Sequence, residues 1–172
     1  PEVDEAVSHL NAAIEALVKV NPSIKFAKTS VTLYKGQTKV TAASLTDLEG
    51  TVTYKTSNKK VAVVNKTTGK VSAKAAGTAT ITATCGEYTA TYKVTVKNPT
   101  LKVSKSAVSV KVGKKVTVTA TAKPSGTVKF TSSNKSVATV SSKGVITGKK
   151  KGTTTVKVTC NGVTKTVKVT VK

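Results

Sequence analysis

The chain has no arginine, no tryptophan and no methionine, and only 7 of its 172 residues are acidic. Base recognition and single-strand binding depend mainly on arginine and on stacking aromatic side chains. Aromatic residues make up only 3% of this chain. The sequence therefore argues against sequence-specific nucleic-acid binding.

Groups that perform catalysis or hold metals are equally scarce. The chain has one histidine, His9, and two cysteines, Cys85 and Cys160. General acid–base catalysis needs a carboxylate or an imidazole near the substrate, and a zinc site needs several ligands at close spacing. Asp47 and Glu49 are the only close pair of acids after residue 20, and a calcium site needs more oxygen ligands than this pair offers. We expect no enzyme activity, no cofactor and no metal site.

Long apolar runs are absent as well. No stretch of about 18 apolar residues occurs, which is close to the minimum for a membrane-spanning helix, and no secretory signal peptide is recognisable. The chain begins at Pro1 and ends at Lys172 inside strand-like sequence. We expect no membrane span, and we expect the chain to be part of a longer protein and to be monomeric as a fragment.

The main feature that is present is an internal repeat. TSNKKVAVVNKTTGKVSAKAAGTATITATC at 56–85 reappears as TSSNKSVATVSSKGVITGKKKGTTTVKVTC at 131–160. Similarity at a fixed spacing indicates a structural module that occurs more than once. An Asn-Pro pair precedes each copy and a VTVK segment closes it, so we expect two domains, 21–97 and 98–172. Residues 1–20 remain as a helical segment or linker.

The segment 1–20 has the period of a helix. Its apolar residues recur at steps of three and four, on one helical face: Val3, Val7, Leu10, Ile14 and Leu17. Pro22 ends the pattern, and His9 lies off the apolar face. We expect a helix that caps the first domain or belongs to a preceding one.

From Ser23 onward the period of the apolar residues is two, which is typical of strands with one buried face. In the first domain the residues expected to face inward are Ala79, Ile81, Ala83, Cys85, Tyr88, Ala90, Tyr92, Val94 and Val96. In the second they are Thr154, Val156, Val158, Cys160, Val163, Val167, Val169 and Val171. Lys165 interrupts the second series, so we expect that strand to start exposed or at a sheet edge.

Turn residues divide each domain into about seven strands, with turn signals every eight to twelve residues, as in Ig-like sandwiches. Tyr54 and Phe130 occupy matching positions before the Ser-Asn turns, and we expect both to be core residues. Each domain has a single inward-facing cysteine, so we expect two free, buried thiols. The predicted fold class is all-β: two tandem Ig-like β-sandwich domains preceded by a short N-terminal α-helix.

Several spaced motifs occur in both copies: Val-x-(Tyr/Phe)-x-(Thr/Ser)-Ser-Asn, Val-Ala-x-Val, a glycine hairpin, Gly-Thr-x-x-(Ile/Val) and a closing Val-x-Val strand. With these motifs the chain resembles the bacterial Ig-like domains of group 2 (BIG2) over nearly all of 21–172. The resemblance implies an extracellular protein, at the bacterial cell surface or secreted. It implies a non-catalytic structural or adhesive stalk segment, and it leaves open an accessory module of a secreted enzyme that associates with anionic or carbohydrate polymers.

The positive charge is concentrated in the second domain. Residues 21–97 hold 12 lysines and three acids, whereas residues 98–172 hold 16 lysines and no acid. Such a surface attracts anions, and lysine makes point contacts without the bidentate geometry of arginine. We therefore expect weak, salt-sensitive binding of cell-wall or host polyanions or glycans, stronger in the second domain. The densest charge and the candidate contact is Lys149, Lys150 and Lys151, where the first domain has Lys74-Ala75-Ala76.

Overall fold

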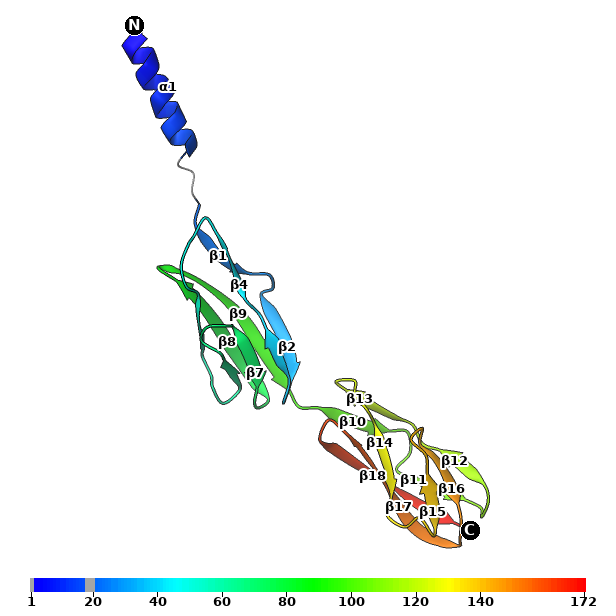
Figure 1. The fold of residues 1–172 in the computed structure, drawn as a ribbon. Helices are drawn as coiled ribbons and strands as arrows, with labels where there is room; N and C mark the ends of the chain where they lie inside the picture. Colours follow the sequence, from blue (N-terminus) through cyan, green and yellow to red (C-terminus); the bar gives the residue numbers. More distant parts are fainter. Residues whose placement is uncertain (1, 18–20) are drawn as a thin grey trace. The chain divides into compact units, whose positions relative to one another are not determined.

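The computed structural model describes residues 2–17 and 21–172, which form one helix and eighteen strands (Figure 1). The chain divides into two compact units, Pro1–Lys97 and Asn98–Lys172. Helix α1 (Glu2–Leu17) carries three acids in its first turn, which stabilise a helix N-terminus. Val3, Val7, Leu10 and Ile14 of its apolar face are exposed, and residues 18–20 of the expected helical segment lie outside the described residues.

Both units are β-sandwiches with the same strand order, so the fold predicted from the sequence is confirmed. The first unit contains β1 (Ser23–Phe26), β2 (Ser30–Tyr34), β3 (Thr38–Val40), β4 (Ala43–Thr46), β5 (Thr53–Thr56), β6 (Ala62–Val64), β7 (Lys70–Ala73), β8 (Gly77–Cys85) and β9 (Tyr88–Lys97). The second contains β10 (Thr100–Val103), β11 (Ala107–Val110), β12 (Lys115–Thr117), β13 (Ala120–Lys123), β14 (Lys129–Ser132), β15 (Ala138–Val140), β16 (Val145–Gly148), β17 (Gly152–Cys160) and β18 (Val163–Val171).

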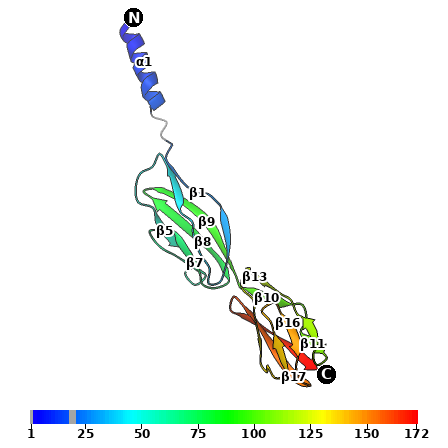
Figure 2. The ribbon, with the colours of Figure 1, turned by 45° about the vertical axis from the view of Figure 1, so that its right-hand side comes forward.

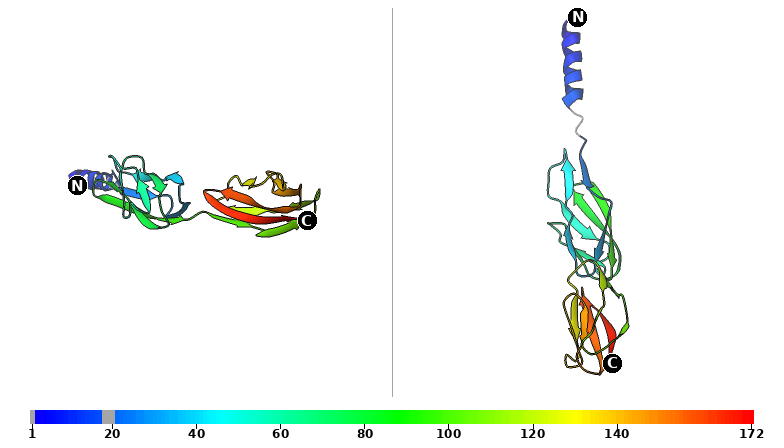
Figure 3. Two further views of the ribbon diagram at one scale, coloured as in Figure 1. Left: turned by 90° about the horizontal axis from the view of Figure 1, so that it is seen from below. Right: turned by 90° about the vertical axis from the view of Figure 1, so that its right-hand side faces the viewer.

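Each sandwich has a four-stranded sheet, β2-β9-β8-β5 in the first unit and β11-β18-β17-β14 in the second. A three-stranded sheet, β3-β7-β6 or β12-β16-β15, forms the other layer, and a two-stranded ribbon, β1-β4 or β10-β13, completes the unit. Figures 2 and 3 show these strands from other sides.

The expectation of about seven strands per unit was too low, because each unit has nine. The difference arises at two breaks near the start of the unit. β1 pairs antiparallel with β4, whereas β2 pairs parallel with β9. A chain that changes hydrogen-bond partners in this way must leave one sheet before it enters the other, so one continuous apolar pattern becomes two short strands.

The alternation along the long hairpin strands was predicted correctly over most of their length. Ile81, Val94, Val156 and Val169 have no exposed surface. Tyr88 was expected to face inward but is 39% exposed. The reason is that β2 joins β9 only from Lys93 onward, so the first residues of β9 have a neighbouring strand on one side only.

In the second unit, the first residues of β18 also have a neighbouring strand on one side only. β11 joins β18 only from Lys168 onward, and Lys165 near the start of β18 is exposed. The prediction of an exposed edge at Lys165 is therefore correct. On the neighbouring strand β17, Thr154, Val156 and Val158 are buried, as expected.

Tyr54 and Phe130 are structurally equivalent, because Tyr54 pairs with Ala83 and Phe130 with Val158 on matching strands. Tyr54 is buried, and Phe130 is half-buried and packs against the core of the second unit, so both are core residues as expected, but Phe130 is covered less completely. In the first unit, the ring centroid of Phe26 lies 6.4 Å from that of Tyr54 and 4.5 Å from that of Tyr92. The second unit has valine at both matching positions, which cover an aromatic ring less completely.

The two cysteines are free and buried, as expected. Each packs against a turn glycine: a Cβ added to Gly50 would lie 3.1 Å from Cys85 Sγ, and one added to Gly126 would lie 3.1 Å from Cys160 Sγ. Each thiol therefore fills a small space in the core of its own unit.

Candidate polyanion-binding site

The lysine triplet predicted from the sequence forms an exposed turn between β16 and β17. The backbone N–H groups of Lys149 and Lys150 donate hydrogen bonds to Val137 O, at 2.8 and 3.2 Å. The first unit has the same turn, because the N–H groups of Lys74 and Ala75 donate to Val61 O at 2.8 and 3.3 Å. The backbone is therefore shared by the two units, and only the side chains differ.

The fold places a second lysine-bearing turn beside the first. In the turn between β11 and β12, Gly113 N–H donates to Gly148 O at 2.9 Å, and Gly148 N–H donates to Lys114 O at 3.1 Å. The C-terminal strand joins the same end of the sandwich, because Val112 N–H donates to Lys172 O at 3.1 Å. Residues that are far apart in the sequence therefore meet at one end of the second unit.

We call this surface the lysine end. It consists of six exposed lysines: Lys111, Lys114, Lys149, Lys150, Lys151 and Lys172. Lys149, Lys150 and Lys151 were predicted as a run in the sequence. The other three were not, because only the pairing of β11 with β18 and of β12 with β16 brings them to this surface.

The first unit has the same backbone arrangement with fewer charges. Gly36 N–H donates to Ala73 O, and Lys35 N–H donates to Lys97 O, both at 2.9 Å. The positions that match the lysine end are Tyr34, Gln37, Lys74, Ala75, Ala76 and Lys97. Two of them are lysines, and Lys35 adds a third where the second unit has Val112.

No carboxylate side chain exists in the second unit to neutralise the lysine end. Neighbouring ammonium groups of the same sign repel each other and create a local positive potential that attracts anions. Because the lysine side chains are exposed, they do not form a shaped pocket. Their combined charge can attract a chain of negative charges without fixing its position.

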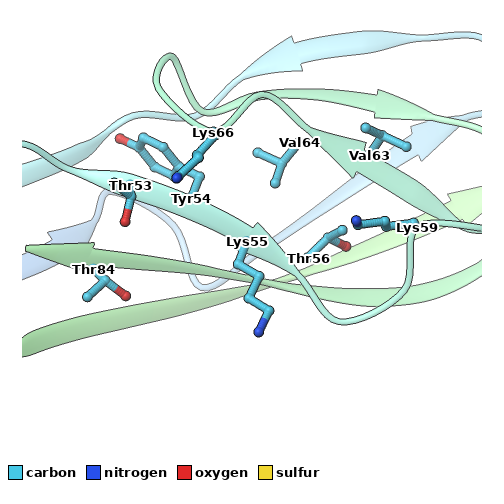
Figure 4. Close-up of a pocket in the computed structure, with 9 residues that line it drawn as sticks. All are labelled: Thr53, Tyr54, Lys55, Thr56, Lys59, Val63, Val64, Lys66 and Thr84. Carbon is cyan, nitrogen blue, oxygen red and sulfur yellow. The ribbon is translucent and has the colours of Figure 1, made fainter.

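A further feature, which the sequence analysis did not predict, is an open groove of about 430 Å³ in the first unit between β5 and β6 (Figure 4). Tyr54, Val63 and Val64 line it together with Lys59 and Lys66. The second unit has a corresponding groove of about 460 Å³, lined by Phe130, Val140, Lys129 and Lys135 among others. Both units therefore have a groove at the same place in the fold, with a few apolar side chains among threonines and lysines.

Other candidate groups lie apart from these surfaces. Asp47 and Glu49 belong to the loop between β4 and β5, where Glu49 O accepts a hydrogen bond from the Cys85 thiol at 3.8 Å. Within the described residues, no group of three or more His, Cys, Asp or Glu side chains could hold a metal ion. No helix in residues 2–17 or 21–172 is long and apolar enough to cross a membrane.

Comparison with known proteins gives one family match. The model of the bacterial Ig-like domain (group 2) matches residues 11–96 and 99–171. No match was found among curated protein sequences.

Several solved structures are similar to the chain. The S-layer protein rSbsC(31-844) is 26% identical with a TM-score of 0.45, and the match covers 88% of this chain and 28% of that chain. Domains 4 and 5 of the S-layer protein SbsC are 25% identical with a TM-score of 0.44, and 88% of this chain and 97% of that chain are covered. The I9-I11 tandem from titin is 11% identical with a TM-score of 0.50, and the match covers 86% of this chain and 65% of that chain. This likeness concerns the fold alone. The chain thus spans about a quarter of the longer S-layer structure.

Proposed function

We propose that this chain, which belongs to the family of bacterial Ig-like domains of group 2, is a non-catalytic structural and adhesive segment of a bacterial surface protein, located outside the cell. The proposal is supported by the two separate hydrophobic cores. It is also supported by the sequence of the second unit, which lacks every carboxylate and histidine that acid–base catalysis would use.

The adhesive part of the proposal rests on one observation, the lysine end of the second unit. Six exposed lysines gather there on a backbone arrangement that carries three lysines in the first unit. A polymer with regularly spaced negative charges can contact several of these lysines at once, so we propose anionic wall polymers or acidic glycans as partners.

The interaction should be weak and sensitive to salt. Lysine ammonium groups are strongly hydrated point charges without the fork geometry of arginine. Exposed charges are screened beyond the Debye length, which is about 8 Å at physiological ionic strength. Affinity therefore arises from the number of simultaneous contacts, and it should fall steeply as salt is added.

The grooves beside β5 and β14 support a second candidate, an accessory module of a secreted enzyme that holds a carbohydrate polymer. Exposed apolar surface of Val63 in the first groove and of the half-buried Phe130 in the second can pack against the C–H faces of sugar rings, and lysines flank both grooves. The parent gene distinguishes the two roles. A catalytic domain in the same protein favours the enzyme module, whereas further repeats and a wall-anchoring signal favour the stalk.

Heparin chromatography of the full chain tests the lysine end. The site variant replaces Lys149, Lys150 and Lys151 with Gln, and the control variant replaces Lys123, Lys157 and Lys165 with Gln. These three lysines are exposed and lie toward the hairpin end of β17. The two variants have the same net charge. We expect the site variant to elute at a lower salt concentration than the control, with unchanged circular dichroism.

Equal elution of the two variants would mean that net charge alone decides retention, and the lysine end would then not be the binding surface. Retention of the wild-type chain at about 0.5 M salt, where the Debye length is only a few ångströms, would also contradict an attraction between exposed charges.

A further inference from the structure

The apolar face of helix α1 has no partner within the described part of the chain. Val3, Val7, Leu10 and Ile14 lie within roughly 60° of one another around the helix, because successive residues are rotated by about 100°. All four side chains are exposed, as is every other residue from 2 to 14. Removing such side chains from water is favourable, so this face can stabilise a contact with another surface.

The negative charge of the chain is concentrated beside that face. Four of the seven acids lie in residues 1–20, and Glu2, Asp4 and Glu5 form the first turn of α1. By the same rotation, Glu2 and Asp4 flank the apolar stripe on its two sides. The helix N-terminus itself carries only about half a positive charge, which does not cancel three carboxylates.

The acidic end of α1 is also separated from the lysines that follow the helix. The helix has 16 residues and is therefore about 24 Å long. Exposed charges are largely screened beyond the Debye length, which is about 8 Å at physiological salt. The first turn therefore has a negative potential of its own, in a chain whose net charge is +22.

The lysine end of the second unit is complementary to this helix in charge and in apolar surface. Its six lysines have no carboxylate in their unit, and Val112, in the turn between Lys111 and Lys114, is 47% exposed. Lysine side chains have long apolar stems that can cover apolar surface while the ammonium group stays in water. The first unit has Lys35 at the position of Val112, so it lacks the apolar side chain there.

We propose that the acidic and apolar face of α1 binds the lysine end of a second copy of this chain. Val7 and Leu10 contact Val112 and the lysine stems, and the carboxylates of the first turn pair with the ammonium groups. The two surfaces differ and each chain carries both, so the contact is heterologous and chains can add one after another. This inference uses the surface of the proposed function, but it does not require a polyanion to bind there.

The association should be weak, because one face of a short helix buries less than the roughly 1,200 Å² at which stable interfaces begin. Sedimentation velocity of the full chain over a concentration series measures it, in about 0.05 M salt, where the Debye length exceeds ~10 Å. We expect a mass that rises with concentration. Val7→Gln with Leu10→Gln keeps the charge and a good helix propensity, and it should abolish the rise.

Two further variants lose three negative charges each and therefore have the same net charge. The helix variant is Glu2→Gln, Asp4→Asn and Glu5→Gln. The control variant, which replaces three exposed acids of the first unit, is Asp47→Asn, Glu49→Gln and Glu87→Gln. The helix variant should lose the rise in mass, and the control variant should keep it.

Mixing two charge-reversed chains tests which surfaces meet. One chain carries Glu2→Lys, Asp4→Lys and Glu5→Lys, and the other carries Lys149→Glu, Lys150→Glu and Lys151→Glu. In each chain the helix and the lysine end then have the same sign, so each alone should stay monomeric. In the mixture, the unchanged helix of one chain meets the unchanged lysine end of the other, so the mass should rise again. This result does not depend on the fold of the reversed helix, because the wild-type helix makes the contact.

A wild-type mass that is independent of concentration would overturn the proposal, and so would a mixture that stays monomeric. An equal loss in the helix and control variants would assign the effect to net charge, against a specific contact. The proposed function fails separately. The helix variant keeps the lysine end and should elute from heparin no earlier than the wild type, even if the chain does not self-associate. A chain that self-associates, but whose Lys149, Lys150 and Lys151 variant elutes from heparin like its control, would contradict the polyanion site alone.

Discussion

Tyr54 Oη accepts a hydrogen bond from the backbone N–H of Ala43 at 3.0 Å, which ties β5 to the start of β4 across the first unit. The corresponding residue of the second unit, Phe130, has no hydroxyl. The two units therefore share a fold but differ in how their aromatic residue is held, and the difference can be measured.

Replacing Tyr54 with Phe should lower the free energy of unfolding of the first unit by about 1–2 kcal/mol, because the Ala43 N–H loses its partner. All four tyrosines lie in the first unit and the chain has no tryptophan, so tyrosine fluorescence in a urea titration reports this unit alone. Tyr34→Phe is the control, since its hydroxyl makes no hydrogen bond to the described residues. Equal stability of Tyr54→Phe and the wild type would contradict a structural role for the bond.

Phe130→Ala should destabilise the second unit by less than the 3–5 kcal/mol that is typical of a fully buried aromatic residue, because Phe130 is only half-buried. Tyr54→Ala should reach that range in the first unit. Hydrogen exchange of the amides of β17 and β8 in the full chain measures the two losses separately. A loss at Phe130 as large as that at Tyr54 would show that partial exposure does not reduce its contribution.

The sequence predicted the parts of the fold that depend on local periodicity. Ile81 and Val156 lie in long alternating strands, and both are buried as expected. The number of strands was not predictable in this way, because the breaks between β1 and β2 and between β3 and β4 reflect a change of pairing partner. Tyr88 fits the alternation, but its exposure depends on where a distant strand, β2, begins to pair.

The candidate sites were likewise predictable only where their residues are neighbours in the sequence. Lys149, Lys150 and Lys151 were visible as a run, whereas Lys111 and Lys172 join them only through the sheet topology. The aligned repeats also differ inside the core, because the first unit has Thr41 and Tyr92 where the second has Val118 and Val167.

Both thiols should be unreactive in the native protein. Cys85 and Cys160 are 2% and 4% exposed, and each packs against a glycine turn that leaves little space around the sulfur. A bulky thiol reagent should modify none of the native thiols within minutes and should modify two per chain in denaturant. Fast modification of either thiol in native protein would show that the β8 or β17 end of its sandwich opens.

The Thr41 hydroxyl is buried and makes no hydrogen bond to the described residues. Thr41→Val should therefore stabilise the first unit by about 1 kcal/mol, because it removes this hydroxyl and keeps the shape of the side chain. The second unit has valine at this position, fully buried, so the fold accepts it. The measurement is the urea midpoint by tyrosine fluorescence, with Thr32→Val on the exposed side of β2 as the control. A destabilised Thr41→Val protein would mean that the hydroxyl has a partner, such as a bound water.

The last prediction concerns alkaline pH. Burial raises the pKa of Tyr92 above its ordinary value of 10.0, so the folded state keeps its phenolic proton at pH values where the unfolded chain has lost it. The folded state then binds more protons, and the free energy of unfolding falls as the pH rises. This contribution is fully present below about pH 10 and is lost as the pH rises from there through the raised pKa.

Lysines also titrate in this range, so the informative quantity is the difference between the wild type and Tyr92→Phe. The stability of the first unit should decline more steeply with pH in the wild type than in the variant, as measured by urea midpoints from circular dichroism. Parallel curves for the two proteins would show that Tyr92 ionises as easily in the folded unit as in the unfolded chain, and that its hydroxyl is in contact with solvent.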